Sequence, residues 1–385
     1  MEISRRKILQ GVGVGAVSTL GLPGWAERSS FYDPAETDGA KRTIHLDRNE
    51  NPYGPPESAV RAMQDSLTTQ NLYPDGSEDL RKKIAEYHKI AAEQVVLGCG
   101  STEVLRMAAD TFLTPGKKLV LAIPTCPILA SFARGKGNEV VEIPLTREYG
   151  HDLTAMLAHG DSSAGLVYIC NPNNPTGTLT PRSDLEDFLH KLPASIPVVI
   201  DEAYHHYVIP TSSYSSFLDQ KISGERTIVT RTFSKIYGLA GVRLGYAVAA
   251  VNLAKQMSEF RLPFGENSAG IAAAMAALDD SEHVRHAAQQ NLNDRQSFFN
   301  SADVRYVRVV DSQTNFALLK LDHPIDEVIA HFRNNRVFVG PRFPQLDGFL
   351  RVSIGNAEEN KAFWRVWDML PHKPVHGMSK DGHHA

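Results

Sequence analysis

The stretch that governs the interpretation of this chain is Thr230-Arg-Thr-Phe-Ser-Lys-Ile-Tyr-Gly-Leu-Ala-Gly-Val-Arg-Leu-Gly-Tyr246. Lys235 follows the hydroxyl residues Thr232 and Ser234, and Arg243 stands further along between two glycines. Hydroxyls, backbone amides and a guanidinium can all donate to a phosphate group, and a lysine beside them can react with an aldehyde. Taken alone, the pattern also fits a strand end and a turn with a surface lysine.

The composition sets broad limits on the class of protein. A chain of 385 residues allows one large or two medium domains with ample core. Hydrophobic residues at 42% and charged residues at 22% are ordinary for a soluble globular protein. A net charge of −4 gives no electrostatic basis for binding nucleic acid. The cysteines (Cys99, Cys126, Cys170) are odd in number and widely spaced, which predicts neither a disulfide framework nor a metal site.

The order of apolar runs and amphipathic stretches predicts the fold class. Strands are expected at 94–98, 118–123, 139–143, 165–169, 197–200, 227–230 and 244–249, and helices at 102–113, 128–134, 182–192, 254–261 and 269–278. This alternation predicts an α/β fold, with a mostly parallel sheet in a large domain. In such sheets, ligands bind beyond the carboxyl ends of the strands. A long helix over 282–299 should lead into a smaller α+β domain.

The N-terminus has a different character from the rest. Arg5 and Arg6 precede an apolar run from Ile8 to Leu22 without an acidic residue, and small residues near Ala26 suit a signal peptidase. The run is short and glycine-rich for a membrane helix, so the mature chain should have no stable membrane span. The segment resembles a twin-arginine signal, which implies periplasmic export through the twin-arginine machinery. A frayed cytosolic N-terminus is the alternative.

Further motifs stand at expected strand ends. Gly98-Cys-Gly-Ser-Thr-Glu103 closes a strand and opens a helix, an arrangement whose free amides and helix dipole favour phosphate. Asn171-Pro-Asn-Asn-Pro-Thr-Gly177 is too rich in proline to continue its strand. Ile200-Asp-Glu-Ala-Tyr204 places a carboxylate at the end of an apolar strand, where it is costly unless paired. A protonated pyridine nitrogen could pair with it, and together with Lys235 these motifs indicate a pocket for pyridoxal 5'-phosphate.

With the late Leu350-Arg-Val-Ser353, this set of motifs resembles the class I/II aminotransferases of pyridoxal-phosphate fold type I. Leu46 to Pro55 and Tyr73-Pro-Asp-Gly76 are most similar to the histidinol-phosphate aminotransferase branch. The resemblance extends over roughly Ile44 to Met369. It implies transfer of an amino group from an amino acid or related amine to a 2-oxo acid, in an exported enzyme.

The resemblance also implies a role for individual residues. Lys235 would hold the cofactor as an internal aldimine, Asp201 would keep the pyridine nitrogen protonated, and Tyr204 would bond the ring's phenolate oxygen. Arg351 would bind the substrate α-carboxylate through both arms of its guanidinium. The other expected ligands are Asn174 for the phenolate oxygen and the substrate, Tyr53 for the substrate, and Ser101, Thr102, Thr232, Ser234, Arg243 and Tyr73 for the cofactor phosphate. Tyr73 would come from the neighbouring subunit of a homodimer, and no metal is implied.

The expected organisation of the chain follows from these assignments. It is a signal peptide at 1–26, an arm with part of the small domain at 27–72, the large cofactor-binding domain at 73–283, the small C-terminal domain at 284–370 and a disordered tail at 371–385. Two other functions fit part of the pattern. A decarboxylase or lyase would share the fold and the lysine, and a catalytically silent binding protein would keep only the pocket.

Two positions depart from the branch that the chain resembles. Cys126 stands where an aromatic residue usually stacks on the cofactor ring. The strand Val337-Phe-Val339 is followed by Gly340 and Pro341, where the branch commonly has an arginine, and Arg342 comes only afterwards. Because a substrate phosphate needs a cationic partner, and because histidine biosynthesis is cytosolic, histidinol phosphate is expected not to be the physiological donor. Histidinol-phosphate aminotransferase proper is the alternative.

Overall fold

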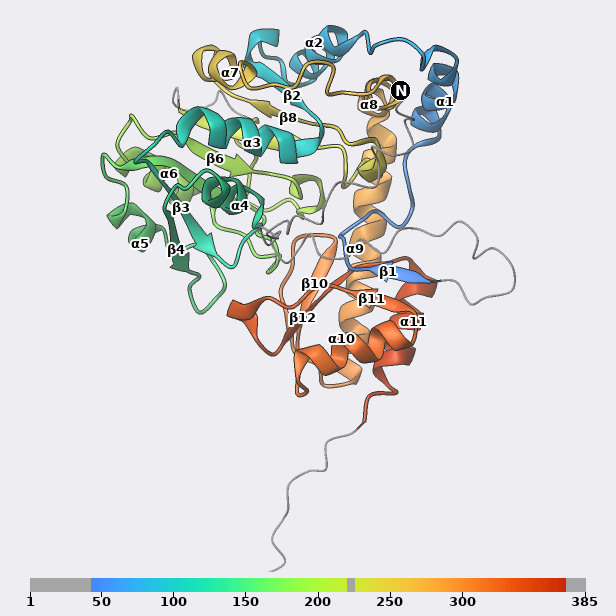
Figure 1. The fold of residues 1–385 in the computed structure, drawn as a ribbon. Coiled ribbons are helices and arrows are strands. Elements are labelled where there is room, and N and C mark those ends of the chain that lie inside the picture. The colour runs from blue at the N-terminus through green and yellow to red at the C-terminus, as the bar shows by residue number, and fades with distance from the viewer. Residues whose placement is uncertain (1–42, 220–225, 372–385) are drawn as a thin grey trace, which may run out of the picture. The chain divides into compact units, whose positions relative to one another are not determined.

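A seven-stranded sheet from the middle of the chain is the centre of the fold (Figure 1). The computed structural model describes residues 43–219 and 226–371. The strand order is β2-β8-β7-β6-β5-β3-β4. In chain order the strands are β2 (Val95–Gly98), β3 (Lys118–Ile123), β4 (Val140–Pro144), β5 (Ala164–Cys170), β6 (Val198–Asp201), β7 (Thr227–Thr232) and β8 (Gly245–Val248).

Strand direction and register bring the motifs to one edge of this sheet. The pairs β4-β3, β3-β5, β5-β6 and β6-β7 are parallel, and β8 is antiparallel to both β7 and β2. Cys170 pairs with Asp201 and Asp201 with Thr230, so β5, β6 and β7 end at nearly the same level. Gly245 pairs with both Thr232 and Gly98, which places the start of β8 at that edge. The prediction of a mostly parallel α/β sheet is confirmed.

Helices cover both faces of the sheet, and the central strand β5 (Ala164–Cys170) is buried along its whole length. The helices of this part are α1 (Glu57–Ser66), α2 (Ser77–His88), α3 (Gly100–Phe112), α4 (Ile128–Gly135), α5 (Leu153–Ala158), α6 (Arg182–Lys191), α7 (Val251–Ser258) and α8 (Ser268–Asp279). Along β5, Leu166 and Tyr168 pack with α3, α4 and α7, while Val167 and Ile169 pack with α5 and α6. The alternation follows from the two-residue period of a strand.

The C-terminal part begins with the long helix α9 (Ser281–Val304) and encloses its own core (Figure 1). Its other elements are β9 (Val309–Val310), β10 (Phe316–Lys320), α10 (Ile325–Asn334), β11 (Val337–Val339), β12 (Phe349–Ser353) and α11 (Ala357–Trp367). The early strand β1 (Ile44–Leu46) pairs in parallel with β11, and Leu46 lies in this core. The first described residues are therefore part of the C-terminal unit. The domain boundaries expected from the sequence stay a prediction.

Some local expectations were inaccurate. Helix α7 spans Val251–Ser258 instead of 254–261, and α5 was not expected. The short α5 is capped by the Asp152 side chain, which accepts from the Ala155 amide, and it is too brief to show a helical period. The expected signal peptide at 1–26 and all but the first residue of the expected tail at 371–385 lie outside the described residues. In the described part of the chain, no helix is long and apolar enough to span a bilayer.

Candidate active site

Lys235 lies just beyond the end of β7, at the sheet edge where the motifs meet. Its Nζ donates to the carbonyl oxygens of Arg48 at 3.0 Å and Asn49 at 2.9 Å. Burial, and next the positive charge of Arg351, lower the pKa of the Lys235 amine from 10.5 to about 8. The neutral amine, which is the form that attacks an aldehyde, is therefore far more populated near neutral pH than in an ordinary lysine, although the protonated form still predominates at pH 7.

Asp201 ends β6 and is only 4% exposed. Its carboxylate accepts from the Tyr168 hydroxyl at 2.8 Å and from the Ala203 amide at 3.2 Å. Burial raises the pKa of Asp201, and the two hydrogen bonds oppose that rise. Within residues 43–219 and 226–371 no cation forms an ion pair with it, so this buried carboxylate has room for a positively charged partner from a ligand.

The phenol of Tyr204 is buried beside Lys235 and is oriented by Asn49. Asn49 Nδ2 donates to the Tyr204 hydroxyl at 3.0 Å, so that the phenolic proton remains free to donate to another group. Asn49 is itself fixed through its backbone. Its backbone N–H donates to Ser353 Oγ, and its backbone carbonyl accepts from Asn315 Nδ2. Burial raises the pKa of Tyr204, which keeps the phenol protonated.

Arg351 stands on β12 and reaches the same cluster from the C-terminal part. Its Nη1 donates to Asn174 Oδ1 at 2.7 Å, and its Nη2 donates to the Asp47 carbonyl at 2.7 Å. Its Nε is buried and has no hydrogen-bond partner among the residues that the structure describes. The guanidinium lies near the rings of Phe316 and Phe343, at 5.7 and 5.3 Å from their centroids. Burial destabilises the guanidinium cation and so lowers the pKa of Arg351. An anion bound beside it would offset this cost.

A group of donors gathers at the amino end of α3. Arg243 Nη1 donates to Ser234 Oγ at 3.4 Å, and a Cβ built on Gly100 would lie 2.5 Å from Arg243 Nη2. A Cβ on Gly245 would lie 2.4 Å from the Ser101 amide nitrogen, so only glycine allows the start of β8 to approach α3 this closely. The expected phosphate ligands of this chain therefore adjoin one helix terminus. They are Ser101, Thr102, Thr232, Ser234 and Arg243.

Two expected site residues lie away from this cluster. Tyr73 is 79% exposed, and its ring packs on Phe264 with 4.7 Å between centroids. Tyr53 turns towards α9, where its hydroxyl donates to Asp294 at 2.7 Å. Burial, and next this hydrogen bond, raise the pKa of Tyr53 to about 12. In the described part of the chain, neither tyrosine forms a hydrogen bond or a ring contact with Lys235, Asp201 or Arg351.

The asparagines of the loop at 171–177 have different roles, because two of them hold neighbouring backbone and side chains and one contacts the site. Asn171 exchanges hydrogen bonds with Thr180, and Asn173 contacts Thr125 and the Pro124 carbonyl. Only Asn174 reaches Arg351. Cys126, next to Thr125, is half-buried, and burial followed by the nearby Asp201 charge raises the pKa of its thiol to about 11. The thiol therefore stands, uncharged, near the carboxylate that the ring nitrogen would face.

The sequence reasoning missed Asn49, Asn315 and Tyr168 as parts of the site. Asn49 entered the sequence analysis only as part of the stretch Leu46 to Pro55, and its positive φ of 55° marks an unusual position. Tyr168 looked like an ordinary core residue of β5. A buried strand-end carboxylate needs a donor from a neighbouring strand, and that requirement could have pointed to the tyrosine two residues before Cys170, the register partner of Asp201.

Comparison with known proteins gives one consistent result. The model of the family "Aminotransferase class I and II" matches residues 41–366. The chain is 36% identical to the histidinol-phosphate aminotransferase of Moorella thermoacetica over 331 residues, 85% of each chain. It is 36% identical to that of Bacillus subtilis strain 168 over 327 residues, 84% of this chain and 90% of the relative. The crystal structure of histidinol-phosphate aminotransferase from Sinorhizobium meliloti, in complex with pyridoxal-5'-phosphate, superimposes with a TM-score of 0.79 at 26% identity, covering 86% and 91% of the chains.

The residues present fit pyridoxal phosphate. Asp201 offers a buried carboxylate that forms no ion pair within the described part of the chain, and Lys235 offers an amine whose pKa is lowered to about 8. The amino end of α3 combines a helix terminus with Arg243 and the space left by Gly100. Asp201 would face the ring nitrogen, Lys235 the aldehyde, and the α3 terminus the phosphate.

The lowered pKa of Lys235 leads to a testable pH dependence. Because only the neutral amine attacks, the rate at which the cofactor-free protein captures pyridoxal phosphate should rise with pH and level off above about 8. Arg351→Met removes a neighbouring positive charge, so the midpoint should move to higher pH. Stopped-flow absorbance across pH 6–11 measures both midpoints. A wild-type midpoint near the 10.5 of an ordinary lysine would contradict the assignment.

Proposed function

The chain belongs to the class I and II aminotransferases, and from that premise we propose that it is an aminotransferase of the histidinol-phosphate type. The supporting observation is the similarity to enzymes of that name over 84–85% of this chain. It is joined by a site in which lysine, aspartate, tyrosine and arginine converge. The comparisons favour this function over the expectation, drawn from Gly340, that histidinol phosphate is not the donor.

The chemistry can be divided between the cofactor and the chain. Bound pyridoxal phosphate supplies an aldehyde and a ring that accepts electrons. Lys235 Nζ is buried and has a pKa of about 8, so its neutral form would take the proton from the amine-bearing substrate carbon and deliver it to the carbon of the cofactor's aldehyde group. The Asp201 carboxylate would stabilise a positive charge at the ring nitrogen, and the Tyr204 hydroxyl, oriented by Asn49, would donate to the ring oxygen.

Arg351 is the anion-binding group of the proposed reaction. Histidinol phosphate carries a phosphate ester and no carboxylate, whereas the 2-oxo acid that accepts the amino group carries a carboxylate. The Arg351 guanidinium donates to Asn174 and to the Asp47 carbonyl. Its Nε has no hydrogen-bond acceptor among the described residues. A planar guanidinium suits either anion, so one residue can serve both half-reactions.

One observation favours a second candidate, an aminotransferase for amines without a phosphate group. Arg342 pairs with Asp326 at 2.9 Å and Asp347 at 3.1 Å and is about half exposed. Within the described residues, no hydrogen bond or ion pair joins Arg342 to Arg351 or to Asn174. A Cβ on Gly340 would lie 2.7 Å from the Arg351 carbonyl oxygen, so Arg351 occupies the space beside that position. Substrate phosphate therefore has one fewer cationic partner than the branch commonly provides.

Steady-state kinetics decide between the two candidates. With 2-oxoglutarate as acceptor, kcat/KM should be at least about tenfold higher for histidinol phosphate than for free aromatic, acidic or basic amino acids, because a charge-assisted phosphate contact is worth about 1.5–3 kcal/mol. Histidinol without its phosphate is the matched control substrate. A preference for a free amino acid, or equal use of histidinol and histidinol phosphate, would reject the first candidate.

The active unit is, in this proposal, a homodimer whose partner subunit supplies Tyr73. Tyr73 is 79% exposed and packs on Phe264, itself 63% exposed. Leu72 and Leu262 are also exposed, at 62% and 52%. Large apolar side chains on neighbouring segments are typical of a surface that a second copy covers.

Complementation tests this arrangement. Lys235→Ala chains lack the amine and Tyr73→Ala chains lack the shared phenol, so each homodimer should be weakly active or inactive. Co-expressed chains with different tags should form mixed dimers in which one of the two sites has both groups, and activity should return in the doubly purified fraction. Pure mixed dimers that remain as inactive as the parents would show that Tyr73 does not act across subunits.

Export is the remaining part of the proposal, and it rests on the N-terminal sequence. Arg5 and Arg6 precede an apolar run with small residues near Ala26. Replacing both arginines with lysine keeps the charge and should leave active enzyme in the cytoplasmic fraction, whereas the wild type should reach the periplasm. Periplasmic recovery of the doubly substituted protein would contradict the twin-arginine assignment.

A further inference from the structure

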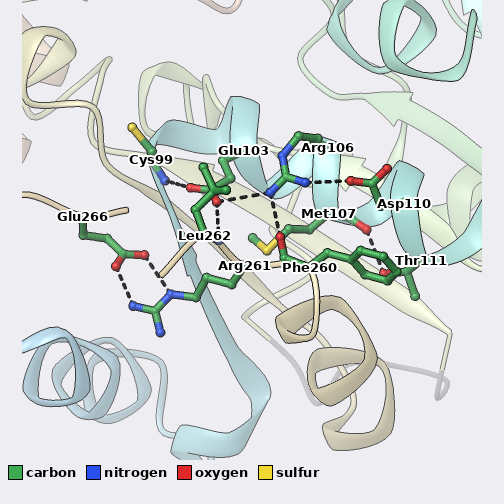
Figure 2. A network of polar contacts seen from close by, with 10 residues as sticks. All are labelled: Cys99, Glu103, Arg106, Met107, Asp110, Thr111, Phe260, Arg261, Leu262 and Glu266. Carbon is green, nitrogen blue, oxygen red and sulfur yellow. Dashed lines mark hydrogen bonds and ion pairs between the residues drawn. The ribbon is translucent and has the colours of Figure 1, made fainter. Parts of the chain in front are cut away.

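We propose that Glu103 is a positioning residue that fixes the amino end of α3 for the cofactor phosphate by tying it to the segment Phe260–Glu266. Figure 2 shows Glu103 between these two parts of the chain. One carboxylate oxygen, Oε2, accepts from the Cys99 amide at 2.6 Å, and the other, Oε1, accepts from the Leu262 amide at 3.0 Å. Glu103 is 5% exposed, so both bonds form away from water.

Arg106 balances the buried charge and strengthens the same connection (Figure 2). Its Nη2 lies 3.3 Å from Glu103 Oε1 and donates to the Phe260 carbonyl at 2.7 Å. Its Nη1 donates to Asp110 Oδ2 at 2.7 Å, one turn further along α3. A buried carboxylate without such a partner would be costly. Arg106 therefore gives the Glu103 carboxylate a cationic partner beside a helix terminus that is expected to hold an anion.

The Cys99 contact determines which amides are left for a ligand. Cys99 is the N-cap of α3, and its N–H is taken by Glu103. The following amides, at Gly100, Ser101 and Thr102, have no intrahelical acceptor because they belong to the first turn. They are the donors that a phosphate at this terminus would use. Glu103 contacts no ligand itself and acts by fixing this turn.

The turn has little freedom to shift. A Cβ on Gly100 would lie 2.5 Å from Arg243 Nη2, and a Cβ on Gly245 would lie 2.4 Å from the Ser101 nitrogen. A small displacement of the start of α3 would therefore disturb both the helix amides and the guanidinium. Because two kinds of phosphate donor depend on one turn, a residue that holds this turn affects phosphate binding more than ring binding.

The segment on the other side of Glu103 is firmly anchored. Glu266 is fully buried and pairs with Arg261, whose Nε donates to it at 3.0 Å, and it also accepts from Ser77 Oγ at 3.3 Å. Asn267 Nδ2 donates to the Val242 carbonyl at 2.7 Å, directly before Arg243. The segment is thus bonded to α3 through Glu103, and Asn267, directly after it, is bonded to the residue before Arg243. Glu103 therefore connects α3 to a part of the chain that is itself held in place.

The test separates phosphate binding from general stability. Cofactor-free Glu103→Gln protein is titrated with pyridoxal phosphate and, separately, with pyridoxal, which has the same ring and aldehyde but no phosphate. The amide oxygen of glutamine can accept one of the two N–H bonds, and its NH2 group then faces the other. The affinity for pyridoxal phosphate should fall about tenfold with little change for pyridoxal, because a hydrogen bond to a charged group is lost.

Asp110→Asn is the matched control, since it alters another carboxylate bonded to Arg106 and leaves the Cys99 and Leu262 contacts intact. Its ratio of affinities should stay within about twofold of the wild type, well below the tenfold step that one lost charge-assisted bond produces. Equal weakening of both ligands by Glu103→Gln, or no weakening, would overturn the proposal. Should that variant not fold, Arg106→Gln carries the same test, and an unchanged ratio there overturns the proposal too. No amino donor is present, so the result is independent of the substrate assignment.

Discussion

The buried carboxylate of Asp201 is the constraint around which the site is built. Its neighbour Glu202, the first residue after β6, is also buried, yet the two carboxylates have different partners. Glu202 is neutralised within the protein by Arg231 at 2.8 Å, with further bonds from Ser216 and the Phe217 amide. Asp201 accepts hydrogen bonds from the Tyr168 hydroxyl and the Ala203 amide, and no ion pair to it is found within the described residues. One charge is satisfied by the fold, and the other is left for the cofactor ring.

The sequence predicted the sheet and the strand-end motifs because both depend on local patterns. Long apolar runs alternating with amphipathic stretches indicate a buried parallel sheet, and β3 was predicted with its observed bounds, Lys118–Ile123. The contacts that orient the site were not predictable in this way. Asn49 meets Tyr204 and Asn315 across more than 150 residues of chain, only because β1 pairs with β11 and carries the following segment over Lys235. Such contacts depend on how distant parts of the chain pack together, and the spacing of apolar residues along the sequence does not predict them.

The cofactor phosphate site and the exposed aromatic pair share one supporting segment. Phe260–Glu266 is bonded to α3 through Glu103 and Arg106, and to α2 through Ser77. The same segment presents Phe264 against Tyr73. In the proposed dimer, the Tyr73 phenol offered to the partner would thus pack against a segment that also holds the phosphate donors of its own subunit in place. This arrangement would make cofactor binding and subunit association sensitive to the same residues.

Arg351 raises the question of how one site accepts two different anions. Its guanidinium is held by Asn174 and the Asp47 carbonyl and lies near the rings of Phe316 and Phe343, so it can move little between half-reactions. A group that binds both a phosphate ester and a carboxylate cannot by itself select the donor, because selection requires a difference in affinity. In the proposed reaction, discrimination must therefore come from residues that contact the rest of the donor. Gly340 matters in this respect, since a side chain there would collide with Arg351 and alter the one anion site that both substrates share.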